Sequence, residues 1–123
     1  MKRLSVDHIK EIHRLMIAET GGLDGVRDEG LLESAVNAPF QTFDNAPLYK
    51  TIEAKAARLG FSLVNNHAFV DGNKRTGMMA MLLFLDINGA GRDCADEEII
   101  RIGLALADGS MDDGALLEWI LDE

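Results

Sequence analysis

The residues that could perform chemistry gather in one short polar stretch in the middle of the chain. This stretch combines a possible base, a possible metal ligand, a glycine, an amide and two cations. It reads His67-Ala68-Phe69-Val70-Asp71-Gly72-Asn73-Lys74-Arg75-Thr76. An apolar run over Gly77–Ile87 follows directly and predicts a helix. The first N–H groups of a helix have no partner within the helix, so polar residues in front of one make a ready anion site.

Most of these side chains have a defined chemical capacity. The imidazole of His67 can take up a proton near neutral pH. The carboxylate of Asp71 is a hard oxygen ligand of the kind that holds Mg²⁺ together with phosphate oxygens. Gly72 lets the backbone approach a ligand closely, because it has no side chain in the way. Lys74 and Arg75 supply cations for phosphate, lysine as a point charge and arginine as a planar fork.

Three further residues complete the pattern. Asn73 offers an amide that can orient neighbours, Thr76 adds a hydroxyl at the helix start, and Phe69 is expected to turn inward and pin the loop to the core. Together they suit transfer of a phosphorus-containing group from a nucleotide to a hydroxyl, with the base taking the hydroxyl proton and the cations holding the phosphates. The plain alternative is a structural histidine beside a surface turn, which each residue taken singly favours.

The rest of the chain is predicted to form helices that hold this loop. Apolar spacing and capping residues place them from Ser5 to Gly21-Gly22, from Asp28 to before Pro39, over Thr51–Asn66, over Gly77–Ile87, from Asp96 through Leu106, and after a capping box at Ser110–Asp113. No stretch alternates as a strand does. We therefore expect an all-α fold of about six helices in a single domain over residues 1–123, with the loop before a buried central helix.

Several segments allow two interpretations. The glycine-rich stretch 21–28 is a simple turn or a loop near the site, and residues 40–50 form either a flap over the site or a plain connector. His8 and His13 lie five residues apart, which is not the spacing of a zinc pair on a helix, so both are expected to be surface or core histidines. A modest basic face, interpreted mainly as solvated surface, is formed by Lys50, Lys55 and Arg58.

Composition narrows the functional classes. The chain is 47% hydrophobic and 27% charged, which is ordinary for a globular protein. Its net charge of -9 disfavours direct nucleic-acid binding, and -8 of it lies in residues 92–123, where 10 acids face 2 bases. The single Cys94 cannot form an internal disulfide. No signal peptide is predicted after Met1, and the apolar run Met78–Leu85 is too short to cross a membrane, so a cytoplasmic location is expected.

The loop resembles the signature of the Fic/Doc superfamily, His-x-Phe-x-Asp/Glu-Gly/Ala-Asn-x-Arg. The resemblance extends to residues 21–28, 31–35 and Pro39, which are similar to the N-terminal part of Doc (death-on-curing) toxins. AMP-transferring Fic proteins usually carry glycine where this chain has Lys74, and a second arginine where it has Met78. Both positions therefore look like the Doc branch.

This resemblance implies a kinase toxin that transfers the γ-phosphate of ATP to a threonine of elongation factor Tu and so stops translation. In that branch the lysine is thought to obstruct the phosphate pocket, so that the nucleotide sits reversed. The implied cofactor is Mg²⁺ with ATP as co-substrate, and the implied partner is a small cognate antitoxin. The implied roles are His67 as general base, Asp71 as the Mg²⁺ ligand, Phe69 as a structural residue, and Gly72, Asn73, Lys74, Arg75 and Thr76 as the nucleotide- and phosphate-binding set.

One departure and two alternatives remain. Doc proteins can carry asparagine where this chain has Met79, which puts a nucleotide contact in doubt. The first alternative is a Fic-type nucleotidyltransferase, which would transfer label from the α-phosphate. The second is a catalytically weak module that binds and titrates an antitoxin.

Overall fold

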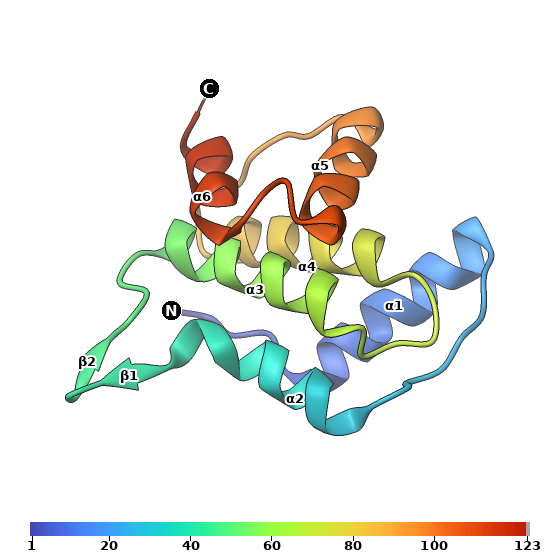
Figure 1. Cartoon of the computed structure of the whole chain (residues 1–123), viewed down its shortest axis with the longest axis horizontal. Coiled ribbons are helices and arrows are strands. Elements are labelled where there is room, and N and C mark those ends of the chain that lie inside the picture. Colours follow the sequence, from blue (N-terminus) through green and yellow to red (C-terminus); the bar gives the residue numbers. More distant parts are fainter. Residues whose placement is uncertain (123) are drawn as a thin grey trace.

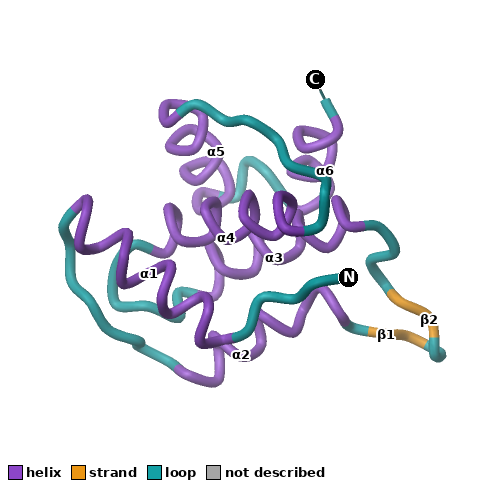
Figure 2. Tube along the Cα trace, turned by 180° about the vertical axis from the view of Figure 1, so that it is seen from behind, coloured by secondary structure: helices purple, strands orange, loops and turns teal. Residues whose placement is uncertain are grey.

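Two long helices lie side by side through the centre of the molecule and are joined by the motif loop, residues 67–72 (Figure 1). The computed structural model describes residues 1–122; Glu123, the last residue of the acidic C-terminal third, lies outside the described residues. The elements are α1 (Val6–Thr20), α2 (Glu29–Asn37), the short 3-10 helix η1 (Ala38–Phe40), β1 (Thr42–Phe43), β2 (Ala46–Pro47), α3 (Ile52–Asn66), α4 (Asn73–Ile87), α5 (Asp96–Asp108) and α6 (Asp113–Leu121). The central pair α3 and α4 is covered on one side by α5 and α6 and on the other by α1 and α2 (Figures 1 and 2).

Side-chain caps explain where several helices begin. Ser5, Asp28 and Thr51 each accept a hydrogen bond from the backbone N–H three residues further on, at the starts of α1, α2 and α3. The ring of exposed His8 also accepts from the Ser5 N–H, which completes a capping box. These helices confirm the predicted starts, and α1 ends at Gly21 as expected.

Three predicted helix starts are wrong by one to four residues. The largest shift concerns α4, which begins at Asn73 with Gly72 as its N-cap, four residues before the expected Gly77. The prediction relied on the spacing of apolar residues, and the first turn of α4 consists of the polar residues of the motif. Helix α5 is capped by Ala95 and not by Asp96, and α6 is capped by Asp112 two residues after the expected Ser110.

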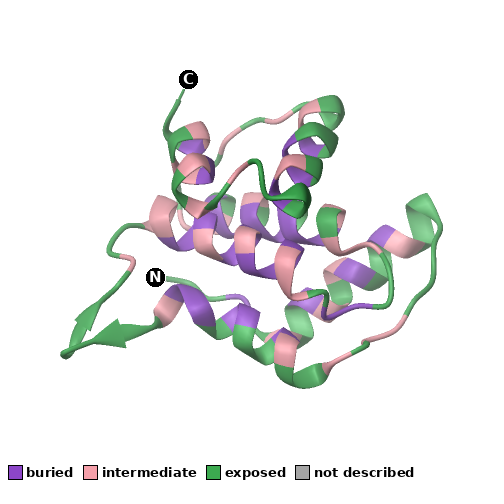
Figure 3. Ribbon diagram, in the orientation of Figure 1, coloured by how far each residue is buried: buried purple, intermediate pink, exposed green. Residues whose placement is uncertain are grey.

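Helix α4 forms the middle of the core. Met78, Met81 and Leu85 are fully buried, whereas Met79 is 40% exposed on the opposite face. Figure 3 shows that buried residues run along the inner faces of α3 and α4. The prediction of a buried central helix with methionines as core filler is therefore confirmed for its inner face. No helix within residues 1–122 has the length and apolar character that crossing a membrane requires.

Residues 40–50 contain a small β-hairpin, which the sequence analysis did not predict. Strand β1 pairs with β2 in antiparallel register, and the two turn residues Asp44 and Asn45 both have positive φ angles, 52° and 62°. Asp and Asn tolerate this left-handed conformation, which two-residue hairpin turns need. Strands of two residues are too short to show alternation. The hairpin projects from the end of the molecule opposite the motif loop, so the hypothesis of a flap over the site is wrong (Figures 1 and 2).

The predicted basic face is solvated surface only at Lys50, which is exposed, and not at Lys55 and Arg58 in α3. Lys55 is only 7% exposed and donates a hydrogen bond to the carbonyl oxygen of Tyr49. Arg58 is half-buried and lies 3.1 Å from a carboxylate oxygen of Asp113 at the start of α6. Both cations are therefore used to hold neighbouring segments onto α3.

The two central helices approach most closely at a pair of glycines. A Cβ atom placed on Gly77 would lie 2.7 Å from Cγ2 of Val64 and 3.1 Å from the carbonyl oxygen of Gly60. One placed on Gly60 would lie 3.1 Å from the sulfur of Met81. Only glycine therefore permits this spacing. Gly77 lies one turn after the start of α4, so this close approach also sets the distance that the motif loop must span.

Replacing Gly77 by alanine tests this packing. Alanine normally favours a helix over glycine by about 1 kcal/mol. Here overpacking costs about 1–3 kcal/mol, so we expect Gly77→Ala to lower the free energy of unfolding by about 1–2 kcal/mol in urea titrations. The matched control is Gly30→Ala in α2, where the added Cβ meets only Asp28 Oδ1 at 3.4 Å. Equal effects of the two substitutions would contradict the close helix approach.

Candidate functional site

His67 ends helix α3 in an unusual backbone conformation. It is the C-cap residue, with φ 52° and ψ 45° in the left-handed region, and it is exposed. Its carbonyl oxygen accepts a hydrogen bond of 2.6 Å from Nε of Arg27, and the same guanidinium donates to the carbonyl oxygen of Asn66 at 3.4 Å. The last carbonyls of a helix have no partner within it, so Arg27 satisfies them and stabilises the bend that places His67.

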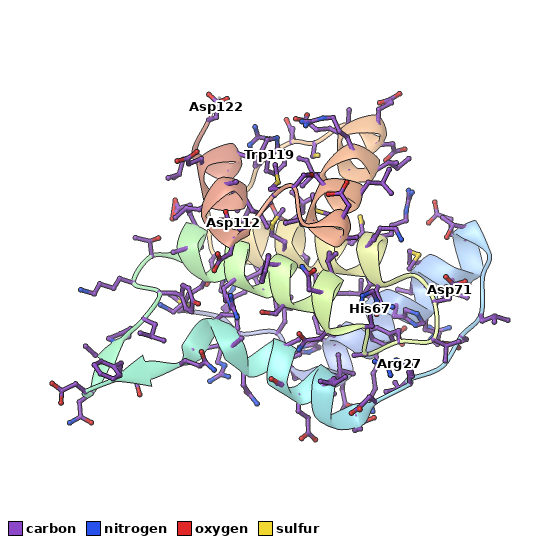
Figure 4. The ribbon with its side chains drawn as sticks, in the orientation of Figure 1. Arg27, His67, Asp71, Asp112, Trp119 and Asp122 are labelled. Atoms are coloured by element: carbon purple, nitrogen blue, oxygen red, sulfur yellow. The ribbon has the colours of Figure 1, made fainter. Side chains whose placement is uncertain are left out.

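The glycine-rich stretch 21–28 lies directly against the motif loop. The N–H groups of Arg27 and Asp28 both donate to the carbonyl oxygen of Ala68, at 2.7 and 3.0 Å. The Val70 N–H donates to the carbonyl oxygen of Gly25 at 3.0 Å. These bonds flank an antiparallel bridge between residues 26 and 69. The interpretation of this stretch as a loop near the site is correct in its placement, and Figure 4 shows Arg27 beside His67 and Asp71.

Asn73 closes the motif loop on itself. Its Oδ1 accepts from the N–H of Phe69 at 3.0 Å, and its Nδ2 donates to the carbonyl oxygen of Phe69 at 3.0 Å. Phe69 turns inward and is 2% exposed. Its ring stacks on the ring of His13 in α1, with centroids 3.9 Å apart and planes 8° apart. Both ends of the Asn73 amide are thus occupied within the loop.

Asp71 presents an oriented carboxylate at the start of α4. Its Oδ1 accepts from the N–H of Gly72 at 2.9 Å, and its Oδ2 accepts from the N–H of Leu23 at 3.2 Å. A carboxylate has about four acceptor positions, so two remain for a ligand. Within residues 1–122 no group of three or more His, Cys, Asp and Glu side chains converges on a point. Because Mg²⁺ is often held by one or two carboxylates plus substrate phosphates, the residues present fit that mode of binding.

The first turn of α4 carries the charge opposite to that of the other five α-helices. Each of those has an acidic residue in its first turn, which complements the positive end of the helix dipole. Helix α4 has no acid and no side-chain cap there, and it carries Lys74 and Arg75 instead. Lys74 is exposed, and Arg75 is 33% exposed and 4.0 Å from Asp96. Two cations and unpartnered N–H groups at one point attract an anion strongly.

Two predicted phosphate-binding residues are differently placed. Thr76 is fully buried, and its hydroxyl has no hydrogen-bond partner, so it does not reach the surface where a phosphate would bind. Gly72 is accessible, but its φ of 79° and the neighbouring helix α1 explain the glycine. A Cβ there would lie 2.7 Å from the terminal methyl group of Met16. Packing and backbone conformation are thus sufficient to require glycine at this position, whether or not a ligand approaches it.

A cavity of about 330 Å³ lies between α1 and α4 beside this first turn. It is lined by Ile12, Leu15, Met16, Arg75 and Met79 together with Glu19 and Thr20 of α1 and Asp96 of α5. Met79 therefore faces a cavity and not the core. A larger cavity of about 520 Å³ lies beside α6, but none of its lining residues belongs to the motif loop or to the first turn of α4.

Two residues that contact the loop were not assigned to the site from the sequence. Arg27 lay in a stretch interpreted by its glycines alone. His13 was predicted to be a structural histidine, and it is 1% exposed, yet its Nε2 lies 2.8 Å from the carbonyl oxygen of Asp71. These contacts join residues 40 and 58 positions apart, so no local pattern could have revealed them.

The fold and the site together define a helical domain with an anion-attracting loop between its two central helices. The sequence profile of the Fic/DOC family matches residues 3–85, which run from before α1 almost to the end of α4. The chain belongs to the Fic/DOC family.

Two relatives carry the names of Doc proteins. Toxin Doc of Mycolicibacterium smegmatis is 51% identical over 69 residues, which are 56% of this chain and 53% of that protein. Protein kinase doc of Escherichia phage P1 is 30% identical over 89 residues, which are 72% of this chain and 70% of that protein. The match to the first therefore spans about half of that toxin's length. Both names support the Doc branch over the AMP-transferring branch.

Removing the Asn73 amide tests whether it holds the loop. In Asn73→Ala the N–H and carbonyl of buried Phe69 lose their partners, which costs about 1–3 kcal/mol of unfolding free energy. Hydrogen exchange of the Phe69 amide should accelerate selectively. The control is Asn65→Ala in α3, which removes one amide bond to the carbonyl oxygen of Phe61 and leaves the loop intact. Unchanged protection at Phe69 in Asn73→Ala would show that the loop does not depend on this amide.

Proposed function

We propose that the chain is a Doc-type toxin that transfers the γ-phosphate of ATP to a hydroxyl group, a threonine, of a protein. The observation that carries this proposal is the first turn of α4. There Lys74 and Arg75 stand where the other α-helices have acids. The exposed residues His67 and Asp71 precede them in the motif loop, and Arg75 lines the cavity between α1 and α4. Such a site suits a polyphosphate and a reacting hydroxyl. The name of the phage relative, a protein kinase, supports the same reaction class.

In the proposed reaction His67 takes the proton of the acceptor hydroxyl. The hydroxyl oxygen then forms a bond to the γ-phosphorus while the bond from that phosphorus to the bridging oxygen breaks and ADP leaves. Lys74, Arg75 and the free N–H groups at the start of α4 hold the phosphates in line. Asp71 would hold Mg²⁺, which when bound neutralises charge on the phosphate oxygens.

The surroundings of the loop suit a protein as acceptor. Leu23 and Val70 are 66% and 50% exposed; Leu23 lies in the glycine-rich stretch against the loop, and Val70 lies in the loop itself. In the proposed reaction these two side chains would supply apolar contacts to a protein acceptor. We propose elongation factor Tu as that protein, on the strength of the family resemblance, and a cytoplasmic location with it.

A cognate antitoxin is the second proposed partner. The name of the M. smegmatis relative, a toxin, supports such a partner. The cavity between α1 and α4 has an apolar rim, with Leu15 54% and Met79 40% exposed, and it includes Arg75. An amphipathic helix bound in this groove would cover the phosphate-binding cation and so inhibit transfer.

Labelled ATP tests the proposed reaction. Purified protein is incubated with Mg²⁺ and bacterial lysate, and with ATP labelled at either the α- or the γ-phosphate. We expect one protein band labelled from the γ-position only, and at least about a hundredfold less label with His67→Ala, because general-base catalysis contributes about 10²–10⁴-fold. The control is His8→Ala, which alters an exposed histidine at the far end of α1. Label from the α-position would indicate a nucleotidyltransferase, and no label from either would favour an antitoxin-binding module.

Variants of Lys74 separate its charge from its size. The stem of Lys74 packs against α5, where a Cβ on Gly103 would lie 3.3 Å from Cβ of Lys74. If its bulk reverses the nucleotide, Lys74→Gly should allow transfer of α-label. Lys74→Met keeps the bulk and loses the charge, so it should retain γ-transfer at a rate about 10–100-fold lower. If Lys74→Gly still transfers only the γ-phosphate, the steric explanation is wrong.

A further inference from the structure

We infer that His13, on helix α1, is a positioning residue that orients Asp71 for binding a divalent cation. The inference rests on the proposed function, because it gives Asp71 the role of Mg²⁺ ligand. It goes beyond that function by assigning a role to a buried histidine from outside the motif. His13 touches neither phosphate nor acceptor in this arrangement and would act only through Asp71.

The ring of His13 has a fixed plane. It is 1% exposed and lies on the buried face of α1 between Ile9 and Met16. Its stacking on Phe69 at 3.9 Å leaves the ring no freedom to tilt. A polar ring on an otherwise apolar face costs free energy unless its nitrogen atoms are hydrogen-bonded. The Nε2 atom of His13 is hydrogen-bonded to a carbonyl oxygen, and its Nδ1 atom lies 3.4 Å from a carboxylate oxygen, a contact that is an ion pair only when the ring carries both protons.

The first of these contacts holds the backbone of Asp71. The Nε2 atom lies 2.8 Å from the carbonyl oxygen of Asp71. A carbonyl oxygen can only accept, so the proton of this bond must be on Nε2. The bond restrains the peptide group between Asp71 and Gly72, and the N–H of that same group donates to Oδ1 of the Asp71 carboxylate. The direction of the carboxylate therefore depends on a peptide group that His13 holds.

The second contact is with Asp24, which follows the residue whose N–H holds the other oxygen of the Asp71 carboxylate. The Nδ1 atom of His13 lies 3.4 Å from Oδ1 of Asp24, which also accepts from the N–H of Gly25. Asp24 directly follows Leu23, whose N–H donates to Oδ2 of Asp71. The two N–H groups that orient the Asp71 carboxylate belong to Gly72 and Leu23. His13 contacts the residue next to each of them, Asp71 and Asp24. A histidine that only filled space would need neither contact.

Two substitutions separate the hydrogen bond from the stacking. His13→Phe keeps a flat ring against Phe69 and loses the donor. His13→Gln loses the ring but offers an amide N–H that can reach the carbonyl oxygen of Asp71. The probes are ADP with Mg²⁺ and ADP with EDTA, titrated by calorimetry. Residues behind metal ligands typically change metal affinity about 10–100-fold. We therefore expect His13→Phe to bind MgADP about tenfold more weakly, with binding of metal-free ADP unchanged and binding restored in part by His13→Gln.

A double mutant tests whether His13 acts through Asp71. In an Asp71→Asn background, His13→Phe should cause no further loss of MgADP affinity, because the carboxylate it orients is gone. Additive losses would overturn the inference, as would equal weakening of MgADP and metal-free ADP, which indicates a general structural role. Unchanged MgADP affinity in folded His13→Phe would overturn it while leaving the proposed phosphoryl transfer intact.

A further test uses the wild-type protein and so does not depend on whether a variant folds. Nitrogen NMR of labelled histidine should find a proton on Nε2 of His13 that exchanges slowly with water. A ring protonated on Nδ1 alone could not donate to Asp71 and would overturn the inference. If the wild type neither binds MgADP nor transfers γ-label, the proposed function fails and the inference fails with it. The labelling experiment thus distinguishes the two failures.

Discussion

The close approach of α3 and α4 is the constraint on which the rest of the structure depends. Gly60 and Gly77 bring the two backbones together, and the side chains of Val64 and Met81 fill the space that larger residues would need. With the helices held at this distance, a loop of six residues must reverse the chain direction. The loop achieves this with two positive-φ residues, His67 at its start and Gly72 at its end. The reactive residues therefore lie in a tight bend that connects two helices packed in the core.

The bend is stabilised by contacts from outside it. Arg27 binds the carbonyl of His67, the Asn73 amide binds both polar atoms of the Phe69 backbone, and His13 contacts the carbonyl of Asp71. Each contact satisfies a backbone group that would otherwise lack a partner. The side chains of His67 and Asp71 consequently stay exposed while the backbone beneath them is restrained. Preorganisation of this kind is what group transfer requires, because it removes the cost of orienting the reacting groups.

The start of α4 shows where stability and ligand binding conflict. Lys74 and Arg75 repel the positive end of the helix dipole, and no side chain caps the helix. Without a ligand this arrangement destabilises the helix end slightly, and a bound phosphate would reverse the sign of the effect. The polar character of this first turn also explains why the apolar spacing predicted the start of α4 four residues too late. The polar and charged residues of this first turn do not follow the apolar pattern by which helices are recognised.

The sequence by itself determined which segments form helices and which kinds of reactive side chain the protein carries. Caps at Ser5, Asp28 and Thr51, apolar spacing along α3 and α4, and the motif 67–76 sufficed to predict an all-α fold and the Fic/DOC family, because these signals are local. The tertiary structure alone decided the rest. Thr76 and Lys55 are buried, and the packing of α1 requires glycine at position 72. The hairpin lies away from the site, and Arg27 and His13 contact the motif loop. Each of these outcomes depends on which segments meet in space, and residues up to 58 positions apart carry no mark in the sequence of being neighbours.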